Sequence, residues 1–248
     1  MVQSNIMQDR LQELFPVHYR NGNILMINAD CMDVMKHIKD KEVELSCVDP
    51  PYGLERHKRG SLRIDNSKKA ENGLLWDEKP SKEYFDELFR VSQKQIIWGA
   101  NNFTLPETEY FIVWDKWQTV DNFASAEYAW TNIKIPAKVF RYAIHKEMAE
   151  RKGEGGKIHP TQKPVKLYEW LLANYAKPGN KILDTHGGSG SSVIACLDMG
   201  YEIMWIEKDP DYFQAALKRI KDFAAQPKLP MDDTPEPVEQ WLGFEEAL

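Results

Sequence analysis

The stretch that decides the fold is Lys181-Ile182-Leu183-Asp184-Thr185-His186-Gly187-Gly188-Ser189-Gly190-Ser191. An apolar strand leads into a glycine-rich turn, and a helical apolar pattern follows through Ala195, Leu197 and Met199. A second apolar strand then runs from Ile203 to Ile206. Two strands joined through a helix are typical of a parallel sheet, because parallel neighbours need a crossover connection. Glycine turns of this kind also let a ligand approach the backbone closely.

The same alternation of strands and helices continues towards the amino terminus. Apolar runs predict further strands at residues 23–28, 43–48, 95–98, 111–114, 128–130 and 139–141. Helical spacing predicts helices at residues 33–38, 82–92 and 164–175, the second capped by Ser81, and a last helix that ends near Phe223. We therefore predict an α/β fold: a doubly wound, mostly parallel, Rossmann-like sheet with helices on both faces.

The length and composition of the chain fit one globular domain. Of its 248 residues 42% are hydrophobic and 28% are charged, which is enough apolar material for a sizeable core. We predict a single domain over residues 1–223 and an acidic, proline-containing tail over residues 224–248. No signal peptide and no run approaching the ~18 apolar residues of a membrane helix is evident, so we expect a cytoplasmic protein without a membrane partner. The three cysteines, Cys31, Cys47 and Cys196, fit neither a disulfide framework nor a zinc site, so we expect reduced thiols and no metal.

The charge of the chain is unevenly distributed. The formal net charge is −6, which argues weakly against a nucleic-acid partner. Two segments are nevertheless basic, a long loop at residues 53–80 and an insert at about residues 131–158. Basic loops meet phosphates locally, whatever the average charge, although a solvated charged surface is the alternative. The residues that we expect to contact phosphates are Arg56, Lys58, Arg59, Arg63, Lys138 and Arg141.

A second motif, Asp49-Pro50-Pro51-Tyr52, directly follows the predicted strand at residues 43–48. Open α/β sheets bind their ligands at the carboxyl ends of their strands. A nucleobase amine is a poor nucleophile, because its lone pair is delocalised into the ring. The Asp49 carboxylate and the Pro50 carbonyl can each accept one N–H of such an amine, the two prolines fix the backbone, and Tyr52 can stack on a flipped base. The alternative is a rigid turn with a surface aromatic.

The glycine turn and the acid that ends the next strand indicate a nucleoside cofactor. The turn lacks the Gly-Lys-Ser/Thr of a P-loop and does not match Gly-x-Gly-x-x-Gly, which disfavours nucleoside triphosphates and dinucleotides. Asp184, ahead of the glycines, suits an amino-acid ammonium group instead. Glu207 lies where an acid in nucleotide-binding α/β units meets the two ribose hydroxyls, a solvent-facing Glu207 being the alternative.

Four pieces of the chain together resemble one enzyme family. They are Asn28-Ala29-Asp30-Cys31, Asp49-Pro50-Pro51-Tyr52-Gly53, His159-Pro160-Thr161-Gln162-Lys163-Pro164, and Asp184 through Ser191 with Glu207. In this order they resemble the β-class amino-methyltransferases of DNA, in which the catalytic tetrad precedes the cofactor glycines. The resemblance covers roughly Asn23 to Ile220. It implies the circularly permuted methyltransferase fold, S-adenosylmethionine as cofactor, double-stranded DNA as partner, and a bacterial or phage setting.

The resemblance also implies roles for individual residues. Asp30 and Cys31 are expected at the adenine end of the cofactor, and Glu207 at its ribose. Thr161 and Lys163 are expected near its carboxylate, with a plain surface charge as the alternative for Lys163. Asp184, Gly188 and Gly190 are expected to shape the methionine pocket. The whole implied cofactor set is Asp30, Cys31, Asp49, His159, Thr161, Lys163, Asp184, His186, Gly187, Gly188, Ser189, Gly190, Ser191, Glu207 and Lys208.

Three aromatic or imidazole side chains near these motifs have two interpretations each. The family usually has Asp-Pro-Phe before its glycines, whereas this chain has Asp184-Thr185-His186. His186 either replaces the aromatic contact with the cofactor or weakens it, and a role as general base is disfavoured because a methylated amine loses its proton readily. Trp98 and Phe103 either line a base pocket or pack in the core.

The residues therefore predict a site-specific methyltransferase that flips an adenine out of DNA and methylates its N6 by in-line displacement. Methylation of cytosine N4 is the nearest alternative, and the aspartate at position 49 favours adenine by the family resemblance. A non-catalytic DNA-binding module is the alternative from another class, and RNA or protein-glutamine acceptors and a dinucleotide oxidoreductase are more remote. The basic insert is short for a domain that recognises a DNA sequence. Three alternatives remain: it contacts few bases, a second subunit of a homodimer assists it, or the loop at residues 53–80 recognises the bases.

Overall fold

The computed structural model of the 248-residue chain describes residues 6–53, 78–118, 124–143, 158–159 and 161–226. The basic loop, the basic insert and the acidic tail are thus described only in part. No helix within these ranges is long and apolar enough to span a membrane.

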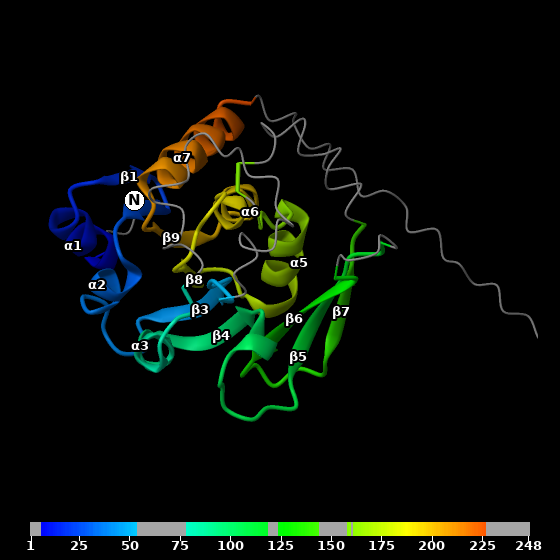
Figure 1. The fold of residues 1–248 in the computed structure, drawn as a ribbon. Helices are drawn as coiled ribbons and strands as arrows, with labels where there is room; N and C mark the ends of the chain where they lie inside the picture. Colours follow the sequence, from blue (N-terminus) through cyan, green and yellow to red (C-terminus); the bar gives the residue numbers. More distant parts are fainter. Residues whose placement is uncertain (1–5, 54–77, 119–123, 144–157, 160, 227–248) are drawn as a thin grey trace, which may run out of the picture.

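The described residues form one nine-stranded sheet in the order β1-β2-β9-β8-β3-β4-β6-β5-β7 (Figure 1). Its strands are β1 (His18–Asn21), β2 (Ile24–Asn28), β3 (Val43–Val48), β4 (Ser92–Trp98), β5 (Phe111–Asp115), β6 (Ala126–Thr131), β7 (Lys138–Arg141), β8 (Lys181–Asp184) and β9 (Glu202–Glu207). From β2 through β9, β8 and β3 to β4 the strands pair in parallel. Only β1 and β6 run antiparallel to their neighbours in the described sheet. The predicted mostly parallel α/β fold is confirmed.

Helices cover both faces of the sheet (Figure 1). One face carries α1 (Ile6–Leu14), α2 (Cys31–Met35) and α3 (Lys82–Val91), and the other carries α5 (Val165–Tyr175), α6 (Ser191–Met199) and α7 (Pro210–Ala224). The residues of β2 illustrate why both faces are covered. Ile24 and Met26 pack in the core under α5, α6 and α7. Leu25 and Ile27 pack in the core under α1, α2 and α3. Successive side chains of a strand point to opposite faces, so a strand that is apolar throughout needs cover on both.

The structure differs from the sequence predictions near the amino terminus and at the start of α3. The elements α1 and β1 were not predicted, since β1 is a polar edge strand without a fully buried residue. Helix α2 begins at Cys31 rather than residue 33, because the Asp30 carboxylate accepts the Met32 N–H at 2.9 Å and caps the helix there. Ser81 occupies the N-cap position of α3, as predicted, but its side chain makes no capping hydrogen bond.

The topology brings the motifs of the sequence to one edge of the sheet. Strands β3 and β8 are neighbours although more than a hundred residues separate them in the chain. From β8 the chain crosses to β9 on one side, and from β3 it crosses to β4 on the other. The carboxyl ends of β3 and β8 therefore form a topological switch point, where open α/β sheets bind their ligands.

Candidate active site

Asp49 and Tyr52 of the Asp-Pro-Pro-Tyr motif contact each other directly. The Tyr52 hydroxyl donates a hydrogen bond to Asp49 Oδ1 at 2.6 Å. The Tyr52 ring lies edge-on to the Phe103 ring, with ring centroids 6.1 Å apart. Pro50, which lies between Asp49 and Tyr52 in the motif, is buried. Tyr52 is only partly exposed, so the alternative of a turn that carries a surface aromatic does not describe this motif.

Gly99 sets the position of the Tyr52 ring. It follows β4 with φ of +67°, and a Cβ built on it would lie 2.0 Å from Tyr52 Cε1. Any other residue at this position would therefore collide with the ring and adopt a left-handed conformation that glycine alone tolerates at low cost. Trp98, one residue earlier, is fully buried, and Phe103 packs on Phe85 at 5.1 Å, so core packing is the observed environment of both aromatics.

Four side chains of alternating charge form a chain of ion pairs from Asp49 to Lys116 along the ends of the strands. Lys163 Nζ lies 2.5 Å from Asp49 Oδ2 and 3.1 Å from Glu127 Oε2, and Lys116 Nζ lies 2.5 Å from Glu127 Oε1. Lys163 is only 5% exposed, which contradicts the alternative of a plain surface charge. A buried lysine requires paired carboxylates, and this one has two.

The pKa values in this chain follow from burial and charge. Burial raises the pKa of Asp49, and the neighbouring Lys163 ammonium opposes that rise. For Lys163, burial favours the neutral amine, but Asp49 and Glu127 outweigh it and raise the pKa above the ordinary range. For Glu127, burial is likewise outweighed by Lys163 and Lys116, which lower its pKa to about 2.

The acid ahead of the glycine turn lies in a different environment. Asp184 is 1% exposed and accepts hydrogen bonds from the Ser192 hydroxyl at 2.6 Å and from the His186 N–H at 3.2 Å. Burial raises the pKa of Asp184 to about 7, and these two hydrogen bonds oppose the rise. Asp184 therefore holds the start of the turn while it keeps a readily titrated carboxyl group at the sheet edge.

Glu207 closes the glycine turn from the neighbouring strand. Its carboxylate accepts the Gly188 N–H at 2.8 Å and the Asp209 N–H at 2.8 Å, so it faces the turn instead of solvent. Gly188 and Gly190 have φ of +54° and +73°. At Gly187 a Cβ would lie 1.8 Å from the Trp205 ring, so this glycine is required by packing against β9. Burial raises the pKa of Glu207.

Asp30, Cys31 and Lys208 lie together beyond the ends of β2 and β9. Lys208 Nζ lies 2.9 Å from Asp30 Oδ2. Burial works against ionisation of Asp30, but the hydrogen bonds from Lys208 and the Met32 N–H outweigh it and lower the pKa of Asp30. Burial raises the pKa of the Cys31 thiol to about 12, so this half-buried cysteine stays protonated at neutral pH.

The remaining predicted cofactor residues surround the glycine turn. His159 lies within 3.6 Å of a Cβ built on Gly188, and its Nδ1 accepts the Thr161 N–H at 3.3 Å. His186 Nδ1 lies 3.0 Å from the Thr185 hydroxyl oxygen, and burial lowers the pKa of His186 to about 4. The buried hydroxyls of Ser189 and Ser191 lie 3.2 Å apart, and Arg219 donates to the Ser191 hydroxyl and the Ser189 carbonyl.

The predicted DNA contacts are described only in part. Arg56, Lys58, Arg59 and Arg63 lie outside the described residues. The other two are on β7, where Lys138 donates to Asn174 Oδ1 at 2.6 Å and Arg141 donates to Asp115 Oδ2 at 2.7 Å. The Arg141 side chain is 65% exposed, so it remains accessible to a phosphate.

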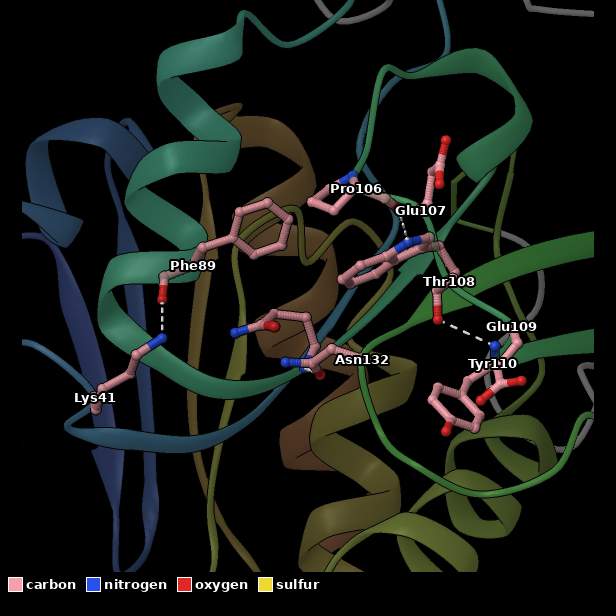
Figure 2. A pocket seen from close by; sticks show the side chains of 10 residues that line it. Lys41, Phe89, Pro106, Glu107, Thr108, Glu109, Tyr110 and Asn132 are labelled. Carbon is pink, nitrogen blue, oxygen red and sulfur yellow. Dashed lines mark hydrogen bonds between the residues drawn. The ribbon is translucent and has the colours of Figure 1, made fainter.

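A separate cleft of about 740 Å³ opens at the amino ends of the parallel strands, opposite to the ends that carry Asp49 and Asp184 (Figure 2). Among the residues that line it, Lys41 precedes β3 and Tyr110 precedes β5, which runs parallel to β4. These positions belong to the amino ends of the strands. The cleft is therefore remote from Asp49 and Asp184, and we do not include it in the site.

Three residues of the site were missed by sequence reasoning: Lys116, Glu127 and Gly99. Lys116 and Glu127 resemble surface charges at the ends of strands, and only the antiparallel pairing of β5 with β6 brings them together. No local pattern in the sequence marks either residue, because the burial of Lys163, which requires anionic partners, is evident only in the structure. Gly99 directly follows the predicted strand at residues 95–98, and the sequence predicts no role for it.

Comparisons with known proteins find similarity to DNA methyltransferases. The family model described as DNA methylase, N6_N4_Mtase, matches residues 107–218. Among curated relatives, type II methyltransferase M.HinfI of Haemophilus influenzae is 23% identical and covers 82% of this chain and 69% of its own length. Type II methyltransferase M2.MboI of Moraxella bovis is 25% identical and covers 86% of this chain and 92% of its own length.

Two solved structures share the fold. The M1.HpyAVI–SAM complex aligns with a TM-score of 0.52 at 19% identity, over 79% of this chain and 99% of that one. The cytosine-N4-specific PvuII DNA methyltransferase aligns with a TM-score of 0.54 at 15% identity, over 81% of this chain and 87% of that one. The family model thus matches residues 107–218, and the two solved structures show that the chain shares the fold of these DNA methyltransferases.

Proposed function

We propose that this chain is a site-specific type II methyltransferase that transfers a methyl group from S-adenosylmethionine to the exocyclic N6 of adenine in double-stranded DNA. The observation that carries the proposal is the adjacency of Asp49 and Asp184 at the ends of neighbouring strands. One strand end offers hydrogen-bond acceptors for an amine, and the other begins a glycine turn suited to a nucleoside. Both lie at the switch point of the sheet.

Asp49 is the residue that we propose to activate the target amine. Its carboxylate, with the Pro50 carbonyl, accepts the amine N–H groups and draws the nitrogen towards a tetrahedral geometry. Tyr52 and Lys163 each occupy one carboxylate oxygen, but an ionised carboxylate has about four acceptor positions, so room remains for the amine. The half-buried Tyr52 ring stacks on the flipped base.

The residues around the glycine turn fit S-adenosylmethionine. This cofactor supplies an electrophilic methyl group on a sulfonium. Glu207 has acceptor positions beyond its two backbone hydrogen bonds for the ribose hydroxyls, and Asp184 provides negative charge for the ammonium group. Asp30, beside Lys208, accepts from the adenine end. His159, Thr161 and the small residues at positions 187–191 shape the pocket between them.

The choice of adenine over cytosine rests on the motif. An aspartate at position 49 favours adenine by resemblance to the family, whereas a structural relative is specific for cytosine N4. Both amines present two N–H donors to the same acceptors, so the catalytic geometry is compatible with either. Cytosine N4 is therefore the second candidate.

DNA is expected to contact the basic segments of the chain. Arg141 and Lys138 on β7, and the basic residues of the 53–80 loop, are the proposed phosphate contacts. Since the insert is short for a reading domain, a homodimer is the arrangement that we propose for reading a site on both strands.

The test is to incubate the protein with S-adenosylmethionine and unmethylated double-stranded DNA, digest the product, and identify the modified nucleoside by mass spectrometry. We expect N6-methyladenine, and we expect none from Asp49→Ala. N4-methylcytosine would correct the base and keep the mechanism. Measurable cofactor binding without any modified nucleoside would contradict DNA as the acceptor.

A further inference from the structure

Glu127 is the least expected member of the charge chain. It lies near the start of β6, where the strand register pairs it with Trp114 of β5. Because β6 runs antiparallel to β4 and β5, its first residues reach the edge of the sheet at which β4 and β5 end. Glu127 thus arrives from the opposite strand direction at the same edge as Asp49.

Two lysines hold the Glu127 carboxylate in place. Lys116 is paired with Oε1 and Lys163 with Oε2, and the Glu127 side chain is 21% exposed. Lys116 is itself held over the Trp114 ring at 4.9 Å. The Lys163 ammonium, whose side chain is 4% exposed, therefore lies between the carboxylates of Glu127 and Asp49.

The order of the charges has a consequence for the chemistry at Asp49. With Asp49 alone, the Lys163 ammonium would form a neutral pair and would draw electron density from the carboxylate that must accept an amine. With Glu127 added, the Lys163 ammonium is shared between two carboxylates, and Lys116 balances Glu127, so the four charged groups together are neutral. Methyl transfer brings positive charge onto the target amine, and the Asp49 carboxylate, which ends this chain of charges, stabilises that change.

We propose that Glu127 is a positioning residue for methyl transfer, which holds the Lys163 ammonium between two carboxylates and so maintains Asp49 as a strong hydrogen-bond acceptor. The proposal rests on the proposed function, because it assigns Glu127 to the reaction at Asp49. Glu127 acts through Lys163 and does not itself contact the target base.

The titration of Asp49 provides a readout that a purely structural role would not change. Its neighbours are Lys163 and Tyr52 in direct contact, with the charges of Glu127 and Asp184 further away. Tyr84 and Tyr168 also face it, but burial raises the pKa of both far above 10, so they stay neutral. The negative charge of Glu127 raises the pKa of Asp49, so its removal is expected to lower that pKa.

The first experiment follows the Asp49 carboxyl group by carbon NMR in the protein without ligands, in the wild type and in Glu127→Gln. We expect the Asp49 titration to move to lower pH by about half a unit or more in Glu127→Gln. Glu127→Asp keeps the charge and should leave the titration near that of the wild type. An Asp49 titration that is unchanged in Glu127→Gln would overturn the inference, whether or not the protein methylates DNA.

The second experiment measures turnover on DNA. Glu127→Gln should lower kcat about 10-fold to 100-fold and shift the acid limb of kcat to lower pH, while the Kd for S-adenosylmethionine stays within about twofold. Glu127→Asp should recover part of kcat. The matched control is Glu42→Gln. The Glu42 side chain is 16% exposed, and its carboxylate lies 2.9 Å from the Arg10 guanidinium. This ion pair is at the amino ends of the strands, away from Asp49.

The outcomes separate the two proposals. A wild type without methyl transfer contradicts the proposed function, and the NMR titration then decides the role of Glu127 independently. A loss of kcat in Glu127→Gln without any shift of the acid limb, and without recovery in Glu127→Asp, would overturn the positioning role and leave Glu127 as a structural ion pair.

Discussion

Asp49 and Asp184 are the same residue type at the ends of neighbouring strands, and their surroundings differ in kind. Asp49 is paired with the Lys163 ammonium and receives the Tyr52 hydroxyl. From the described residues Asp184 receives the Ser192 hydroxyl and a backbone N–H, and burial raises its pKa to about 7. Burial raises the pKa of both carboxyl groups, but at Asp49 the Lys163 ammonium opposes the rise, whereas at Asp184 two neutral hydrogen-bond donors oppose it. We infer that one carboxylate serves an amine and the other serves a cationic ligand.

The largest expected effect separates these two roles by removing each charge in turn. Asp49→Asn should lower kcat about 10³-fold and leave the Kd for S-adenosylmethionine within about twofold, because a lost acceptor acts in the transition state. Asp184→Asn should instead weaken cofactor binding about tenfold or more, because the ammonium loses its counter-charge. Single-turnover rates and calorimetric titration with the cofactor measure the two quantities. Equal loss of cofactor affinity in both variants would break the comparison.

The next effect concerns stability and pH. The folded pKa of Asp184 is about 7 against an ordinary 3.8, so the folded protein binds this proton more tightly than the unfolded chain. The stabilisation is complete below about pH 4 and is lost as pH rises through 7, with an upper limit of about 4 kcal/mol. Urea unfolding of the ligand-free protein between pH 5 and 8 should show stability falling with pH, and Asp184→Asn should flatten that slope. An identical slope in Asp184→Asn would show that other groups govern it.

The smallest expected effect concerns the Asp49 side alone. Gly99→Ala places a methyl group against the Tyr52 ring and should lower kcat roughly 10-fold to 100-fold without changing cofactor affinity. Gly200→Ala is the matched control, because Gly200 has φ of +74° but nothing within 4 Å of its built Cβ. Both variants should lose about 1 kcal/mol of stability from the left-handed backbone. A loss of kcat of similar size in Gly200→Ala would mean that the contact with Tyr52 is unimportant.

Much of this fold could be predicted from local sequence. The strand at residues 43–48 and the unit from Lys181 onward were placed correctly, because runs of apolar residues ended by glycine or proline leave few alternatives. The edge strand β1 was missed, since its polar residues resemble a loop. Helix α1 was missed in the same region.

The residues of the candidate site likewise separate into those that the sequence predicted and those that it did not. Asp49, Tyr52, Asp184 and Glu207 were identified because each lies within a contiguous motif at a strand end. Glu127 and Lys116 were not, because no local pattern marks a charge whose partner is supplied by another strand. The role of Lys163 changed from an expected cofactor contact to a partner of Asp49 for the same reason, although contact with the cofactor remains a prediction.

The sequence by itself determined the parallel α/β fold, the order of its motifs and the chemistry that each motif offers, because those properties reside in short, contiguous segments. Only the tertiary structure decided which carboxylate is paired with a cation. That pairing depends on the antiparallel β6 and on the segment before α5 meeting at the end of β3. Electrostatic energies depend on distances of a few ångströms between groups remote in the chain, and only the packed fold specifies those distances.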